Sequence, residues 1–163
     1  MKLADGSQPK RLDAVRQLFK EYAASLNFAL CFQNFEAELA NLPGDYAPPS
    51  GCLLLALRDE NAAGCVALRR LEDGICEMKR LYVRPAYRGA GVGKALAEEI
   101  VRRAQKLGYK LMRLDTVDSM HEAQALYRSL GFTDTAPYCF NPLEGVRFME
   151  LKLSSEPSRQ EIE

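Results

Sequence analysis

The sequence predicts an α/β fold in which helices surround one long central meander of antiparallel strands. Runs with helical and with strand-like apolar spacing alternate along the chain. Three apolar runs between residues 52 and 83 are joined only by short turns. A glycine-rich turn then opens a long amphipathic helix after residue 91.

The first half of the chain is predicted to contain helices followed by strands. The helices have apolar residues on one face, and the strands are short apolar runs between turn-forming residues. In order, these elements are a helix from Pro9 to about Leu26, a helix from about Phe35 to Leu42, a loop over 45–51, a hairpin of Cys52 to Arg58 and Gly64 to Arg69, and a strand from Ile75 to Val83.

The second half begins with a helix whose apolar face runs from Val92 to Leu107 and which Gly108 can end. The elements predicted after it are a strand from Lys110 to Val117, a helix that Asp118 or Ser119 can cap and that runs to about Leu130, and strands over 132–135 and 146–153.

Length and composition fit one domain. The chain has 163 residues, of which 47% are hydrophobic and 27% charged, enough for a sizeable core. No repeat or linker divides it. We therefore expect a single domain over residues 1–153 and a polar, disordered tail over residues 154–163.

Charge, cysteine and histidine content exclude several classes of function. Basic and acidic residues number 22 each, so the chain has no general attraction to nucleic acid or to anionic membrane. Without an 18-residue apolar span or a signal-peptide pattern, a cytoplasmic protein is expected. No cysteine pair has metal-ligand spacing and His121 is the only histidine, so no metal is expected. The cysteines are predicted to be small buried hydrophobes in a reducing compartment: Cys31, Cys52, Cys65, Cys76 and Cys139.

The junction between the strand ending at Val83 and the helix from Val92 is predicted to bind a pyrophosphate. Glycines at alternate positions let several N–H groups point one way, and the helix adds the positive end of its dipole. The residues of this turn are Arg88, Gly89, Ala90, Gly91, Val92, Gly93 and Lys94. Positive charge also gathers here, at Arg80, Arg84, Arg88 and Lys94.

Two common phosphate loops do not fit this turn. A Walker loop needs a glycine where Arg88 stands and a serine or threonine where Ala95 stands. The dinucleotide fingerprint needs its third glycine at Lys94. The turn instead resembles the Gln/Arg-x-x-Gly-x-Gly/Ala loop of the GCN5-related N-acetyltransferase (GNAT) superfamily, through Arg88, Gly91 and Gly93.

This resemblance covers nearly the whole chain, from Pro9 to Leu153. It implies a GNAT-like acyl-CoA N-acyltransferase fold, with a mixed, mainly antiparallel central sheet flanked by helices. The family usually begins with a strand before the first helix, but only residues 1–8 are present here for it, so that strand is expected to be short or missing.

The resemblance also implies acetyl-CoA as donor. The resemblance further implies that backbone groups of Leu81, Tyr82 and Val83 bind the pantetheine arm and polarise the acetyl carbonyl. The expected reaction is direct attack of a primary amine in a ternary complex, without a metal.

The same resemblance supplies a general acid. Residues 125–132 are similar to the family's Leu-Tyr-x-x-x-Gly-Phe segment, whose tyrosine points toward the coenzyme sulfur, and this assigns the acid to Tyr127. The family commonly has an asparagine seven residues earlier, where this chain has Met120. A buried tyrosine with a locally satisfied hydroxyl is the alternative.

Glu77 is the first candidate for the base that deprotonates the amine. It lies four residues before Leu81, so strand alternation would place both side chains on one face. The alternatives are that Glu77 is an exposed carboxylate paired with Lys79 or Arg69, that the base is Asp115 or Asp118, or that a water chain serves. A nucleophilic cysteine, Cys76 or Cys139, is the rival mechanism.

The acceptor is expected to be a small-molecule, peptide or protein amine, bound by two variable regions, residues 26–51 and 137–145. Both regions are aromatic-rich and carry carboxylates that could attract an amine: Phe28, Phe32, Phe35, Tyr46, Tyr138 and Phe140, with Glu36, Asp45 and Glu144. Core packing explains these aromatics equally well. A homodimer through the terminal strand follows by analogy only. The competing function is a non-catalytic acyl-CoA sensor.

Overall fold

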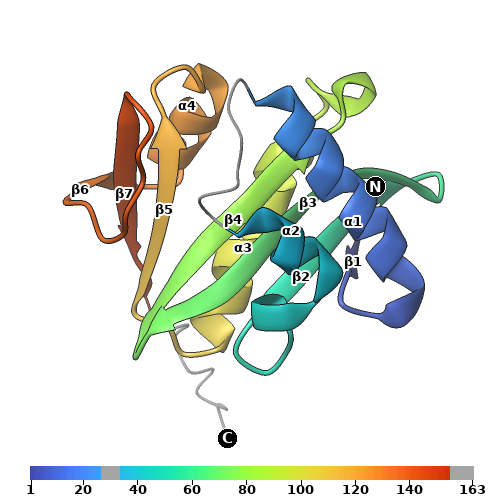
Figure 1. Cartoon of the computed structure of the whole chain (residues 1–163), viewed down its shortest axis with the longest axis horizontal. Helices are drawn as coiled ribbons and strands as arrows, with labels where there is room; N and C mark the ends of the chain where they lie inside the picture. The colour runs from blue at the N-terminus through green and yellow to red at the C-terminus, as the bar shows by residue number, and fades with distance from the viewer. Residues whose placement is uncertain (27–33, 155–163) are drawn as a thin grey trace, which may run out of the picture.

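The computed structural model describes residues 1–26 and 34–154, and these form one α/β domain around a seven-stranded sheet (Figure 1). The strand order is β1-β2-β3-β4-β5-β7-β6. Every neighbouring pair is antiparallel except β4 and β5, which are parallel. The predicted class, a mixed and mainly antiparallel sheet flanked by helices, is confirmed. The tail predicted over 154–163 falls outside the described residues except at Ser154.

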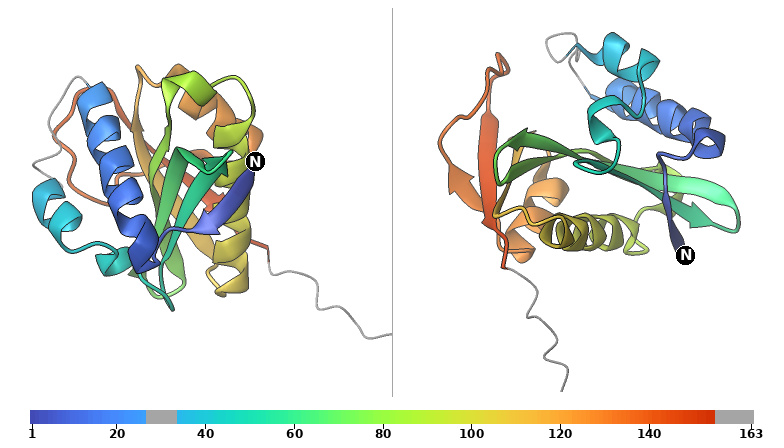
Figure 2. Two further views of the ribbon diagram at one scale, coloured as in Figure 1. Left: turned by 90° about the vertical axis from the view of Figure 1, so that its right-hand side faces the viewer. Right: turned by 90° about the horizontal axis from the view of Figure 1, so that it is seen from below.

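The helices lie on both faces of the sheet: α1 and α2 cover one face, and α3 and α4 the other (Figure 2). The strands are β1 (Lys2–Asp5), β2 (Cys52–Arg58), β3 (Asn61–Glu72), β4 (Ile75–Val83), β5 (Leu111–Val117), β6 (Thr133–Thr135) and β7 (Val146–Lys152). The helices are α1 (Pro9–Ser25), α2 (Phe35–Ala40), α3 (Val92–Lys106) and α4 (His121–Ser129), with short 3₁₀ turns η2 (Gly44–Tyr46) and η3 (Pro85–Tyr87).

Two boundaries differ from the sequence prediction. The β2–β3 turn is only Asp59 and Glu60, both with positive φ, and β3 begins at Asn61 instead of Gly64. The predicted cap of α4 is wrong, because Met120 is the N-cap residue and no side chain caps it. Asp118 forms an ion pair with Arg147 instead. The front strand exists and is short, four residues that pair with β2.

A separate apolar core fills each side of the sheet. Val15, Leu18 and Phe19 of α1 pack on one face, and Leu96 and Ile100 of α3 pack on the other. The apolar spacing in the sequence predicts both helices because each buries a single face. The cysteine prediction holds for Cys65 and Cys76, which are buried, and is wrong for Cys139, which is exposed; Cys31 lies outside the described residues.

The central strands β4 and β5 separate partway along their length. They pair at only three positions, from Ile75 opposite Leu111 to Glu77 opposite Arg113. Beyond Glu77 the β5 side of β4 has no strand partner among the described residues, while β3 still pairs with its other edge. A site can therefore open inside the sheet, between two rigid strands.

A bulge in β4 lies at the start of this separation. Arg80 has a φ of 60°, and the β3–β4 register shifts between Cys65 and Ala67. The bulge reverses the alternation of side chains, so that Leu81 packs against the α3 core, as Met78 does, and Tyr82 packs in the α1 core. Glu77, next to Met78, therefore lies on the face opposite Leu81, and the prediction that they share a face is wrong.

Candidate active site

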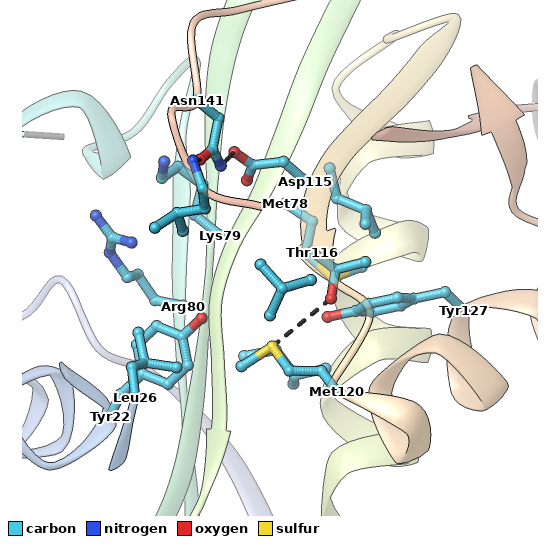
Figure 3. Close-up of a pocket in the computed structure, with 14 residues that line it drawn as sticks. Tyr22, Leu26, Met78, Lys79, Arg80, Asp115, Thr116, Met120, Tyr127 and Asn141 are labelled. Atoms are coloured by element: carbon cyan, nitrogen blue, oxygen red, sulfur yellow. Dashed lines mark hydrogen bonds between the residues drawn. The ribbon is translucent and has the colours of Figure 1, made fainter. Parts of the chain in front are cut away.

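A narrow pocket of about 50 Å³ lies where β4 and β5 separate (Figure 3). Its walls come from both strands, the end of α1, the start of α4 and the loop before β7. Lys79, Asp115 and Asn141 gather at one end of it, which we call the polar end. Tyr127 and Met120 lie at the other.

Tyr127 projects from α4 into this pocket. Its ring is buried, at 8% exposure, and packs against Phe132 at 5.8 Å between ring centres. Within the described residues the Tyr127 hydroxyl forms no hydrogen bond. Every fully buried side-chain oxygen and nitrogen there has a hydrogen-bond partner, so the Tyr127 hydroxyl is not fully buried and opens into the pocket. Burial raises the pKa of Tyr127 well above its ordinary value, which keeps the phenol protonated at neutral pH.

Met120 occupies the place of the family's usual asparagine and also lines the pocket. Its sulfur accepts a hydrogen bond from the Thr116 hydroxyl, at 3.6 Å between Oγ1 and Sδ. The side chain therefore offers a polarisable thioether to this end of the pocket instead of an amide.

The glycine turn borders a groove of about 300 Å³ that runs along the end of β4. Gly89 and Gly91 have φ near 80°, a conformation that other residues rarely adopt. Gly91 is the N-cap of α3, so the N–H groups of the next helical residues, including Val92 and Gly93, have no acceptor within the helix. The groove thus presents backbone donors at a positive helix end, as an anion requires.

The predicted coenzyme residues fall mostly on this groove. It is lined by Leu81, Tyr82, Val83, Arg88, Gly89, Gly91, Val92 and Gly93. Ala90 and Lys94 are outside the lining, and the Lys94 side chain is 67% exposed. Arg88 donates to the Val83 carbonyl at 3.0 Å, so its side chain braces the turn. Leu81 borders both this groove and the Tyr127 pocket, which makes the two spaces neighbours.

Glu77 is not part of the lining of the pocket. The side chain is only 1% exposed. Its Oε1 accepts a hydrogen bond from Arg69 at 2.8 Å, and its Oε2 accepts one from the Tyr138 hydroxyl at 2.6 Å. Glu77 is therefore a buried carboxylate whose two oxygens both accept hydrogen bonds. The alternative prediction, an exposed carboxylate paired with Lys79 or Arg69, is right about the partner Arg69 and wrong about the exposure.

Asp115 does line the pocket, from β5. Its Oδ2 accepts a hydrogen bond from Asn141 Nδ2 at 3.1 Å. Lys79 faces the same space from β4, and burial, above all, lowers its pKa from the ordinary lysine value. Sequence reasoning missed Lys79 and Asn141 as site residues. Asn141 could have been predicted, because this residue belongs to the late loop, residues 137–145, that was predicted to bind the acceptor.

The aromatic residues predicted to bind the acceptor do not form one pocket. Phe28 and Phe32 lie outside the described residues, and Phe140 is 80% exposed. Tyr46 is buried and donates to Glu38 at 2.9 Å. Tyr138 is held by Glu77, as above. None of the predicted amine-attracting carboxylates lines the Tyr127 pocket: Glu36, Asp45 and Glu144.

The rival cysteine mechanism has no support in this geometry. Cys76 is buried, and desolvation raises the pKa of its thiol to about 12, which makes it a poor nucleophile. Cys139 is exposed, but desolvation raises its pKa too. Among residues 1–26 and 34–154 no cluster of three or more His, Cys, Asp or Glu side chains is suited to hold a metal ion, and no helix there has the length and apolarity to cross a bilayer.

Comparison with known proteins shows which family and fold this chain resembles. The sequence model of the family described as Acetyltransferase (GNAT) family matches residues 12–132. An N-acetyltransferase of Schizosaccharomyces pombe, itself uncharacterized, is 46% identical over 149 residues, which span 90% of this chain and 91% of that protein.

Solved structures share the fold. A GNAT-family acetyltransferase from Staphylococcus aureus superposes with a TM-score of 0.76 at 20% identity, over 94% of this chain and 99% of that one. A GNAT-superfamily phosphinothricin acetyltransferase from Sinorhizobium meliloti, solved in complex with AcCoA, superposes with a TM-score of 0.71 at 20% identity, over 98% of this chain and 94% of that one.

Proposed function

The chain belongs to the GNAT family of acetyltransferases, and from this premise we propose that it moves an acetyl group from acetyl-CoA to a primary amine by direct attack in a ternary complex. The observation that carries the proposal is the position of Tyr127. Its hydroxyl opens into a pocket that adjoins, through Leu81, the groove of the glycine turn. One thioester that reached from the glycine turn into the pocket would have its sulfur near Tyr127 in this proposal.

Different groups of the protein carry out the separate steps of the proposed reaction. The backbone donors of the glycine turn hold the pyrophosphate, and the unpaired β5-side edge of residues 81–83 holds the pantetheine arm and polarises the acetyl carbonyl. As the new C–N bond forms and the C–S bond breaks, Tyr127 gives its proton to the departing thiolate. A carboxylate, Glu77 or Asp115, takes the proton that the ammonium must lose.

Acetyl-CoA binding and amine-dependent thiol release, measured in one sample, test the whole proposal. Binding with release supports the transferase. Binding without release, for any amine tried, would favour either the competing acyl-CoA sensor, with which Met120 in place of the usual asparagine is consistent, or a protein acceptor absent from the panel. Absence of binding would contradict the glycine-turn site itself.

The Tyr127→Phe variant tests the acid. We expect kcat to fall about 100-fold, the lower end of general acid contributions, while the Kd for acetyl-CoA changes little. Tyr109→Phe is the matched control, because it also removes one phenolic hydroxyl, one that donates to Ser50 O far from the pocket. Unchanged turnover of Tyr127→Phe across the pH range would show that Tyr127 is not the acid.

A further inference from the structure

We propose that Tyr22 is a further catalytic residue, whose phenolic hydroxyl donates a hydrogen bond to the acetyl carbonyl oxygen of the bound donor. This inference rests on the proposed acetyltransferase function and adds a residue to it. It comes from a second tyrosine hydroxyl that reaches the same pocket as Tyr127 from another helix.

Tyr22 enters the pocket from α1, on the other side of the sheet from α4. Helices α1 and α4 cover opposite faces of the sheet (Figure 2), and the pocket lies in the gap between β4 and β5. The hydroxyls of Tyr22 and Tyr127 point into this gap from its two sides (Figure 3). A thioester in the gap would therefore lie between two phenols.

The Tyr22 hydroxyl forms no hydrogen bond with residues 1–26 or 34–154. Every fully buried side-chain oxygen and nitrogen of these residues has a hydrogen-bond partner, so the Tyr22 hydroxyl is not fully buried and opens into the pocket. The ring packs, partly buried, against the α1 core, and its centre lies 6.0 Å from that of the Tyr82 ring. A donor that packing holds in position and that no described protein group uses indicates a ligand atom as its partner.

Tyr22 lies beside the strand edge that is proposed to polarise the carbonyl. Residues 81–83 line part of a wider cavity of about 540 Å³, and three side chains border both this cavity and the narrow pocket: Tyr22, Leu81 and Met120. The pantetheine arm would pass from the strand edge into the pocket at this point. The thioester carbonyl is bonded directly to the sulfur, so in this proposal it lies between Tyr22 and Tyr127.

The Tyr22 hydroxyl suits the carbonyl oxygen better than it suits the amine. Burial raises the pKa of Tyr22, and this effect exceeds the opposing effect of the nearby Arg80 charge, so the phenol stays protonated and can donate. The hydrogens of the attacking amine need acceptors, and Asp115 at the polar end is one. The carbonyl oxygen needs donors instead, because it takes up negative charge as the amine attacks.

In this step Tyr22 donates a hydrogen bond and keeps its proton. As the C–N bond forms, an electron pair of the C=O double bond moves onto the oxygen, where the Tyr22 hydroxyl and the strand edge of residues 81–83 stabilise it. When this pair returns to carbon, the C–S bond breaks and Tyr127 gives its proton to the sulfur. Burial and, after it, the nearby Tyr22 raise the pKa of Tyr127, so Tyr127 holds its proton until the thiolate forms.

The infrared band of the bound carbonyl tests the contact directly and needs no acceptor. Acetyl-CoA, isotope-labelled at its carbonyl carbon, is bound to wild type, to Tyr22→Phe and to the control Tyr109→Phe, whose lost hydroxyl donates to Ser50 O. A hydrogen bond weakens the C=O bond, so we expect the band to move to higher frequency in Tyr22→Phe alone. Tyr22→Phe with an unchanged band, or without acetyl-CoA binding, would overturn the inference. Absence of binding by the wild type would instead overturn the proposed function.

Turnover with an accepted amine separates this role from a structural one. We expect Tyr22→Phe to lower kcat about 100-fold, the effect of removing one oxyanion donor, with little change in the Kd for acetyl-CoA or in the KM for the amine. The pKa values read from the pH dependence of kcat should stay those of the wild type, because Tyr22 transfers no proton. A higher KM for the amine at an unchanged kcat would place the hydroxyl on the acceptor and overturn the inference.

Discussion

Two carboxylates, Asp115 and Glu77, are the proposed candidates for the base, and their surroundings differ. Asp115 lines the pocket, whereas Glu77 is buried outside its lining and is held by Arg69 and Tyr138. A group that takes a proton from the amine must reach it directly or through one water molecule. Asp115 meets this condition because it lines the pocket. Glu77 stays a predicted base, but another group would have to carry the proton from the amine to it.

Paired substitutions distinguish the two roles. We expect Asp115→Asn to lower kcat about 100-fold through loss of the base. Glu77→Gln should instead destabilise the protein, because it removes the charge that holds Arg69 and Lys79. Urea unfolding and kcat, measured on both variants, check this. If the Glu77→Gln enzyme had wild-type stability and a kcat about 100-fold lower, the base would be Glu77.

Glu77 also connects separate parts of the proposed acceptor site. Its bond from Tyr138 fastens the loop that carries Asn141, and Tyr138 packs further against Phe148 at 5.3 Å and beneath the Arg113 guanidinium at 5.6 Å. Positioning of Asn141, and through it of Asp115, thus depends on a carboxylate that does not itself face the pocket.

We propose that the N-terminus of α3 contributes to coenzyme binding, and Gly91→Glu tests that contribution. A Cβ at Gly91 would have no neighbouring atom within 4 Å, so the substitution acts mainly through its charge in front of the backbone donors and through the strain of a φ of 80°. We expect the Kd for acetyl-CoA to rise about 100-fold or more, as calorimetry would measure.

Gly108→Glu is the matched control for this change. Gly108 follows the other end of α3, has a φ of 88° and also has open space around it. The backbone strain is therefore similar, while the site is remote from the groove. Equal affinity for acetyl-CoA in the two variants would refute the anion site at Gly91.

The β4 bulge depends on a contact from another element. Arg80 adopts its positive φ while its side chain, 3% exposed, is bound to Glu38 of α2 and stacks over Phe35 at 5.2 Å. Tyr46 donates to the same Glu38 at 2.9 Å. The short helix α2 thus contacts the bulge that reorients Leu81 and Tyr82, and so links the region proposed to bind the acceptor to the strand proposed to bind the coenzyme.

The order of elements was predictable because helix and strand periods are local properties of the sequence. The glycine turn and the segment around Tyr127 were predictable because each carries its own motif. The bulge at Arg80 was not, since its partner Glu38 lies 42 positions away. The engagement of Glu77 by Tyr138 spans 61 positions and was equally hidden. What sequence reasoning missed is therefore side-chain pairing between distant elements, and this pairing decides which carboxylate faces the pocket.

The molecule as a whole should lose stability in mild alkali through its buried thiols. Burial raises the pKa of Cys76 to about 12 and that of Cys65 still further, whereas an unfolded thiol has a pKa of about 8.5. Below that value both states hold the proton and the stability is fully present. As the pH rises above it, only the unfolded chain releases protons, so the free energy of unfolding falls.

One buried thiol should account for about 1.4 kcal/mol of this loss between about pH 7.5 and pH 9.5, a window that ends below the ordinary tyrosine pKa of about 10. Urea unfolding under reducing conditions at both pH values measures it. Cys76→Ala should reduce the loss by that amount. Met112→Ala opens a cavity at the position paired with Cys76 but removes no titrating group, so it should lower stability equally at both pH values. The same pH-dependent loss in wild type and Cys76→Ala would mean that this thiol ionises alike in the folded and unfolded protein.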